Sequence, residues 1–87
     1  MDLEIALLGQ WCINTQEYVA RVALTPRGGC GPYAYYHDAK LIGTSSRGIQ
    51  YDIRWREEAS AVGTLSLVGQ DGQRVDKGFF YKGLDCN

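Results

Sequence analysis

The chain has 87 residues, a length typical of one compact unit, and residues 1–87 are predicted to form a single domain. Its composition, 45% hydrophobic and 22% charged, is that of a globular protein and argues against a disordered chain. The net charge of −1 lacks the basic excess by which nucleic-acid binders displace counterions from phosphates, so DNA or RNA binding is disfavoured.

The first eight residues contain two acids, no base and only a short apolar run, which does not match a secretory signal. Nowhere does the chain approach the roughly 20 consecutive apolar residues that span a bilayer. The sequence therefore predicts a cytoplasmic protein without membrane contact.

The same N-terminal segment fits two kinds of secondary structure. Asp2 can cap a short helix that Gly9 ends, with Leu3 and Leu7 on one face. Leu3, Ile5 and Leu7 would equally share one face of a strand. We expect the short helix.

A Gly-x-Trp motif, Gly9-Gln10-Trp11, follows this segment. In this motif the chain resembles the calycin group, which includes lipocalins and small lipocalin-like domains, where Gly-x-Trp opens the first strand after a helical turn. The resemblance implies an up-and-down barrel around a small apolar ligand, with Trp11 packed at the closed end. Outside that group, Trp11 would be a core residue of an unrelated sheet.

The stretch 48–56 has the clearest pattern in the chain, because apolar and polar residues alternate strictly. Such alternation predicts a strand with one buried and one solvated face, and hence an antiparallel sheet. Further strands are expected at 11–13, 17–25, 33–37, 40–44, 61–69 and 74–82, with a turn at Asp38-Ala39. The predicted fold is mainly β: a curved antiparallel up-and-down sheet or a small, partly open barrel, with a short N-terminal helix.

Asp71-Gly72 lies between the last two apolar runs and predicts a β-hairpin with a two-residue type I′ turn. That register would place Thr64 opposite Phe79 and Gly63 opposite Phe80. Large side chains would then lie on both faces of the hairpin, and the second face would need cover from the helix, from barrel closure or from a second subunit. We therefore expect a homodimer.

The chain has three cysteines and one histidine, with no Cys-x-x-Cys pair and no metal-ligand spacing. Three reduced thiols are expected, and a Cys12–Cys86 disulfide is the alternative in an oxidising setting. Neither a metal site nor a cofactor is predicted.

His37 is the only candidate general base, and Asp38 follows it directly. Neighbouring residues of one strand point to opposite faces, which argues against a His–Asp pair. Cys30 with His37 could form a nucleophile and base, but nothing in the sequence supplies an oxyanion hole. The polar face formed by Gln50, Asp52, Arg54 and Arg56 could bind an anion or stack on bases, or simply be solvated. The sequence thus predicts no enzyme.

Aromatic residues exceed what a small core needs, which favours a binding surface. The leading hypothesis is a non-enzymatic small-molecule binding module that acts as a homodimer and takes an apolar ligand. The alternatives are a structural or protein–protein interaction module without a ligand, and a single-stranded nucleic-acid binding barrel. The predicted ligand-binding residues are Trp11, Tyr33, Tyr35, Tyr51, Trp55 and Phe79.

Overall fold

The computed structural model describes residues 1–56 and 60–83, and within these ranges the chain forms strands and turns only. The seven strands are β1 (Asp2–Cys12), β2 (Glu17–Arg27), β3 (Tyr33–His37), β4 (Lys40–Ser45), β5 (Ile49–Arg56), β6 (Ala61–Val68) and β7 (Arg74–Tyr81). The predicted N-terminal helix is wrong, because these residues pair with β2 along the whole length of β1. A helix of one or two turns is marginal by itself, whereas β2 offers an eleven-residue partner edge.

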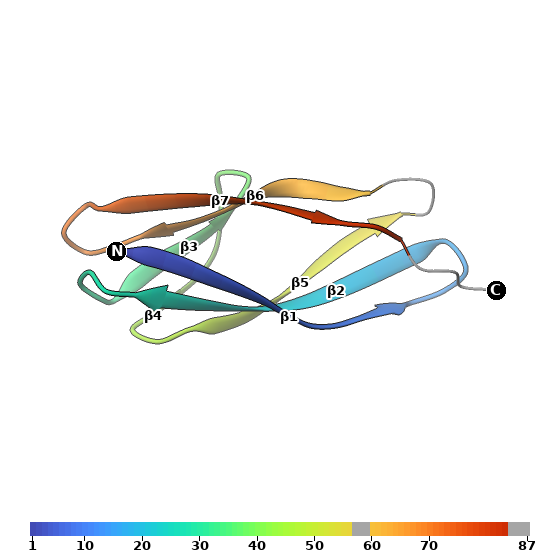
Figure 1. Ribbon diagram of the computed structural model, residues 1–87, viewed down its shortest axis with the longest axis horizontal. Helices are drawn as coiled ribbons and strands as arrows, with labels where there is room; N and C mark the ends of the chain where they lie inside the picture. The colour runs from blue at the N-terminus through green and yellow to red at the C-terminus, as the bar shows by residue number, and fades with distance from the viewer. Residues whose placement is uncertain (57–59, 84–87) are drawn as a thin grey trace.

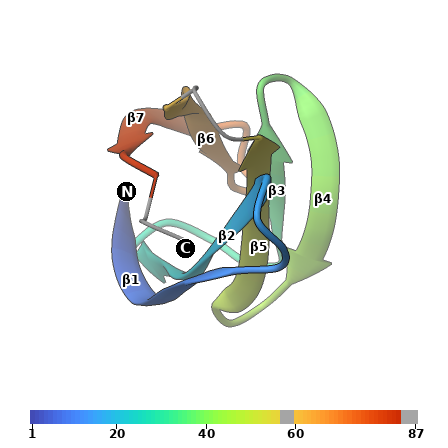
Figure 2. The same ribbon diagram turned by 90° about the vertical axis from the view of Figure 1, so that its right-hand side faces the viewer.

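The strands form two antiparallel sheets that face each other as a β-sandwich (Figures 1 and 2). One sheet has the order β1-β2-β5 and the other the order β4-β3-β6-β7. The mainly β, antiparallel prediction is confirmed. The simple up-and-down order is not, since β2 pairs with β5 and β3 with β6. No ladder among the described residues joins the two sheets into a closed barrel.

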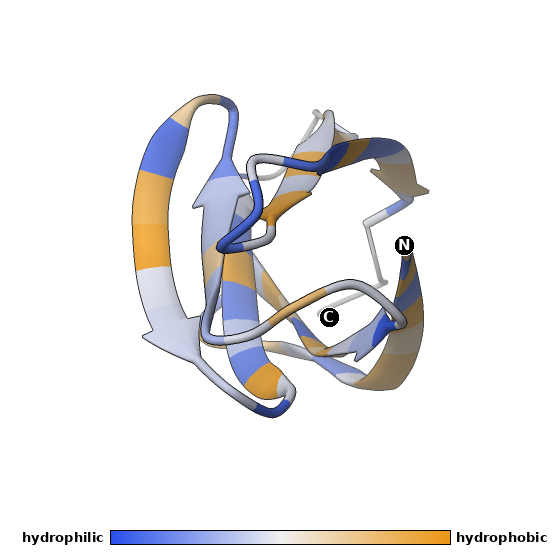
Figure 3. Ribbon diagram, turned by 90° about the vertical axis from the view of Figure 1, so that its left-hand side faces the viewer, coloured by the Kyte–Doolittle hydropathy of each residue, from blue (hydrophilic) through white to orange (hydrophobic). Residues whose placement is uncertain are grey.

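The core lies between the inner faces of the two sheets, and the strand alternation that the sequence predicts is visible along the ribbon (Figure 3). In β5, Ile53 is buried and Arg54 is exposed, as predicted for a half-buried strand. The core residues are Leu3, Val22, Leu24, Tyr33, Tyr35, Ile53, Ala61, Leu65, Leu67 and Phe79.

The β6–β7 hairpin exists, but its register differs from the prediction by one residue. Gly72 adopts a φ of 86°, and its amide donates to the Gly69 carbonyl at 3.1 Å. The connection is thus a longer turn with a left-handed glycine, rather than the two-residue type I′ turn. Phe79 consequently lies opposite Gly63 and faces the core, whereas Phe80 lies opposite Val62 and faces outward.

The predicted turn at Asp38-Ala39 is confirmed, with φ values of 47° and 70° at its two residues. It ends β3 at His37, while β6 continues on to Ala61. The β3–β6 ladder covers only residues 65–68 of β6. At the other end of β6 the sheet is therefore only two strands wide, and the space between β5 and β6 is open at the side.

The opposite side of the sandwich, where β1 meets β7, is fastened by polar contacts. The Asp2 carboxylate is 3.2 Å from the Lys77 ammonium, and the Gln10 side-chain amide donates to the Lys82 carbonyl. Cys12 is disulfide-bonded, so the expectation of reduced thiols is wrong for this residue, and its predicted partner Cys86 lies outside the described residues. The cytoplasmic location stays a prediction.

Candidate functional site: the cleft between β5 and β6

Three of the six predicted ligand-binding residues, Tyr33, Tyr35 and Phe79, belong to the core. Tyr33 and Tyr35 are buried, and their hydroxyls donate to the carbonyls of Gly28 at 2.7 Å and Arg47 at 2.6 Å. These bonds satisfy the polar tips of both rings and tie β3 to the loops on either side. Tyr33 and Tyr35 therefore act as packing residues and do not line the cleft between β5 and β6.

Trp11 lies apart from the other predicted residues, on the outer face of the β1-β2-β5 sheet. The register of β1 against β2 shifts between Leu7 and Gly9, so Trp11 turns outward opposite Val19. The Arg21 guanidinium lies 5.0 Å from the centre of its ring, a cation–π contact. Trp11 is 39% exposed, and it does not line the cleft between β5 and β6.

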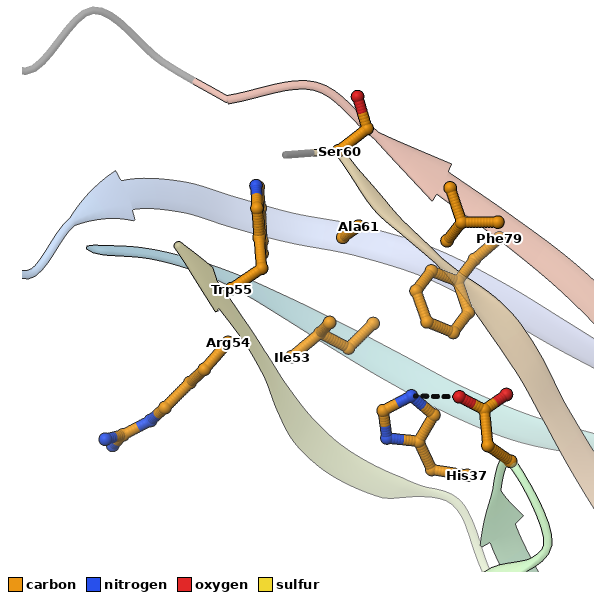
Figure 4. Close-up of a pocket in the computed structure, with 9 residues that line it drawn as sticks. His37, Ile53, Arg54, Trp55, Ser60, Ala61 and Phe79 are labelled. Atoms are coloured by element: carbon orange, nitrogen blue, oxygen red, sulfur yellow. Dashed lines mark ion pairs between the residues drawn. The ribbon is translucent and has the colours of Figure 1, made fainter. Parts of the chain in front are cut away.

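Trp55 and Phe79, by contrast, come together in the cleft between β5 and β6. Figure 4 shows their rings approaching the cleft from different strands, with Ile53 and Ala61 between them. The Arg54 side chain points away from this space (Figure 4). The cleft has a volume of about 200 Å³ and is lined by His37, Asp38, Ile53, Arg54, Trp55, Ser60, Ala61, Val62 and Phe79.

The indole of Trp55, a residue that lines the cleft, carries a buried polar atom without a partner among the described residues. Its Nε1 is buried and has no hydrogen-bond partner among the described residues. The ring itself is held by Tyr18, whose centroid is 5.5 Å away. A buried donor without an acceptor is rare in folded proteins, and each such group calls for an explanation.

His37 forms one wall of the cleft and connects it to Tyr51, the sixth predicted residue. The His37 Nδ1 is 2.6 Å from the Tyr51 hydroxyl, and its ring packs 5.4 Å from that of Phe79. Burial, followed by the charge of Asp38, raises the pKa of the Tyr51 hydroxyl. The direction of the hydrogen bond between the two side chains depends on the tautomer of His37.

His37 and Asp38 do face each other, which corrects the expectation from strand geometry. His37 Nε2 is 3.5 Å from a carboxylate oxygen of Asp38 (Figure 4). The pair forms because Asp38 belongs to the turn, where its left-handed backbone directs the side chain back toward the strand. Cys30 is exposed in the loop before β3, whereas His37 is the last residue of β3, so the two do not form a nucleophile–base pair.

The polar outer face of β5 contains a paired charge. The Arg21 guanidinium donates to both carboxylate oxygens of Asp52, at 2.8 and 3.1 Å. An open depression of about 480 Å³ lies here, lined by Arg21, Gln50, Tyr51 and Asp52. Because its two opposite charges already neutralise each other, it offers no net charge to an ionic ligand.

This ion pair predicts a pH-dependent stability. The hydrogen bond from Arg21 holds the pKa of the Asp52 carboxyl below its ordinary value. A lowered folded-state pKa gives stability that is present above the ordinary value and is lost as the pH falls through the folded value. We expect the melting temperature to fall less steeply below about pH 4 in Asp52→Asn and in Arg21→Gln than in the wild type. Calorimetry across this range measures it, and a wild-type slope in both variants would contradict the assignment.

Sequence reasoning left Asp38 and Ala61 out of the predicted ligand-binding residues, although both line the cleft. Of these, only Asp38 had a signal in the sequence. It belongs to the predicted turn at Asp38-Ala39, and a turn that ends one strand early exposes the edge of the neighbouring strand. No group of three metal-ligating side chains occurs in the described parts of the chain. Nor do residues 1–56 and 60–83 contain a helix that could cross a membrane.

No protein-family model, no curated protein and no solved structure matches the chain. The calycin resemblance accordingly remains a prediction. Gly9-Gln10-Trp11 lies inside β1, after the bulge and without a preceding helix in the described residues.

Proposed function

We propose that the protein is a non-enzymatic binding module and that the cleft between β5 and β6 is its binding site. The observation that carries the proposal is the buried Nε1 of Trp55, which has no partner among the described residues. An unsatisfied donor of this kind costs about 1–3 kcal/mol. A ligand that turned the ring and brought a hydrogen-bond acceptor to this atom would offset this cost.

The size of the cleft favours a protein partner over a small molecule. Small-molecule pockets usually measure roughly 300–1,000 Å³, and this cleft, at about 200 Å³, is smaller. One large side chain with its backbone outside fits this space better than a whole ligand. We therefore propose the interaction module, and the small apolar ligand stays a prediction. Seven-stranded sandwiches are frequent among cell-surface domains, which is a fold-level analogy only.

A simple probe tests whether the cleft binds anything. N-Acetyl-leucinamide combines one apolar side chain with two amide carbonyls, so it suits an apolar cleft with one free donor. Titrated into ¹⁵N-labelled protein, it should shift the indole N–H resonance of Trp55. The indole of Trp11 is the internal control, assigned with Trp11→Phe. Two unmoved indoles, or two that move alike, would overturn the proposal.

We also propose that two copies associate through the outer face of β6 and β7. Val62 and Phe80 lie opposite each other there and are 68% and 57% exposed. Phe80→Asp should convert a dimer to a monomer in native mass spectrometry, while Leu41→Asp, an exposed site on β4, should not. A monomeric wild type would refute the dimer. Phe79→Asp is unsuitable as a test because Phe79 lies in the core.

A further inference from the structure

We infer that the cleft takes an extended segment of a partner protein, which adds as a strand to the β4-β3-β6-β7 sheet beside Val62. The inference rests on the proposed binding function and names its partner. Strand addition needs a free sheet edge and a pocket for an inward-facing side chain. The end of β6 provides both.

The free edge begins where Asp38 ends the β3–β6 ladder. The Asp38 amide donates to the Thr64 carbonyl at 2.9 Å, and the Thr64 amide donates to the Asp38 carboxylate at 2.9 Å. The carboxylate thus takes the place of the carbonyl that a continuing strand would offer. Beyond Thr64 no described residue pairs with this side of β6.

The direction of the Thr64 backbone N–H and C=O shows which other backbone groups of β6 lack a partner strand. In an antiparallel strand, hydrogen-bonding direction alternates from one residue to the next. Both backbone groups of Thr64 face the β3 side, so those of Val62 face the same way. Val62 therefore presents an N–H and a C=O to the empty position in line with β3.

The side chains around this position define what the added strand carries. Residues opposite Ala61 and Gly63 would point inward, and the one opposite Val62 outward. The Phe79 ring covers Gly63 so closely that a Cβ there would lie 2.8 Å from its edge, which leaves room only for a small residue opposite. The larger side chain therefore enters opposite Ala61, near Trp55.

The charge at the start of the empty position indicates a cation in the partner. A segment antiparallel to β6 runs in the direction of β3, so its N-terminal end adjoins Asp38. The Asp38 side chain is 59% exposed, and among the described residues it pairs with His37 and accepts from the Thr64 amide. Asp38 itself occupies the position opposite Thr64, so the segment begins opposite Gly63, and a terminal ammonium there complements the carboxylate.

These features give a probe, the amidated tetrapeptide Ala-Thr-Leu-Thr with a free amino terminus. Its Ala falls opposite Gly63, with the terminal ammonium adjoining Asp38, its first Thr falls opposite Val62, and its Leu falls opposite Ala61. We expect it to shift the Trp55 indole and to slow hydrogen exchange of the Val62 amide. The same peptide N-methylated at its first Thr loses the donor for the Val62 carbonyl and should bind about tenfold more weakly. Val62→Pro removes the Val62 N–H and leaves the pairing with β7 intact. It should weaken binding of the unmodified peptide by about as much as N-methylation does.

The outcomes separate this inference from the proposed function. Equal binding of both peptides, an unprotected Val62 amide, or shifts at another sheet edge would overturn strand addition. A response to N-acetyl-leucinamide without any response to the peptide would overturn it as well and leave the binding module standing. If neither probe moves the Trp55 indole, both proposals fail.

Discussion

Tyr35→Ala is expected to cost the protein a large share of its stability. Tyr35 is completely buried on β3, and its hydroxyl donates to the Arg47 carbonyl at 2.6 Å. Removing a buried aromatic ring costs about 3–5 kcal/mol. The total stability of an 87-residue domain is only about 4–13 kcal/mol. Denaturant unfolding followed by circular dichroism measures the loss in free energy of unfolding.

Two further substitutions control this experiment. Tyr36 is the next residue and faces the other side of the sheet, so Tyr36→Ala should cost far less. Tyr35→Phe keeps the ring and leaves the Arg47 carbonyl without its partner, which should cost about 1–3 kcal/mol. If Tyr35→Ala and Tyr36→Ala lowered the free energy of unfolding equally, the assignment of Tyr35 to the core face of β3 would be wrong.

The class of the fold could be predicted from the sequence because alternation is a local signal. Residues 49–56 show it clearly, and their faces lie as predicted, with Tyr51, Ile53 and Trp55 inward. The N-terminal strand could not be predicted in this way. The pattern of Leu3, Ile5 and Leu7 fits helix and strand alike, and only pairing with β2, a long-range contact, decides between them.

The site depended on a one-residue register that sequence could not fix. Asp71-Gly72 suits a two-residue turn, but it equally suits a longer turn in which Gly72 supplies the left-handed position. A slip of one residue reverses every side chain of β7. It brings Phe79 into the cleft and sends Phe80 to the surface, so the predicted aromatic residues divide between core, cleft and outer face.

Gly63→Ala is expected to destabilise the protein and to close the cleft at the same time. A Cβ on Gly63 would lie 2.8 and 2.9 Å from two atoms of the Phe79 ring and 3.0 Å from an Asp38 carboxylate oxygen. Phe79 cannot yield freely, since Tyr81 stacks 5.9 Å away and His37 packs 5.4 Å away. Such overpacking costs about 1–3 kcal/mol. Denaturant unfolding measures the cost, and N-acetyl-leucinamide should then shift the Trp55 indole less than in the wild type.

Gly78→Ala is the matched control, because Gly78 lies on β7, opposite Thr64 and beside the same part of β6. A Cβ there would meet only the Gly63 carbonyl oxygen, at 3.8 Å, which is ordinary contact. Because alanine has less conformational freedom than glycine in the unfolded chain, Gly78→Ala should leave the free energy of unfolding unchanged or raise it by up to about 1 kcal/mol. The contrast isolates the Phe79 ring as the cause, since both changes add one methyl group to a strand glycine. Equal costs for the two would mean that the ring moves aside freely, and a cleft wall that yields so easily could not hold the side chain of a partner in one orientation.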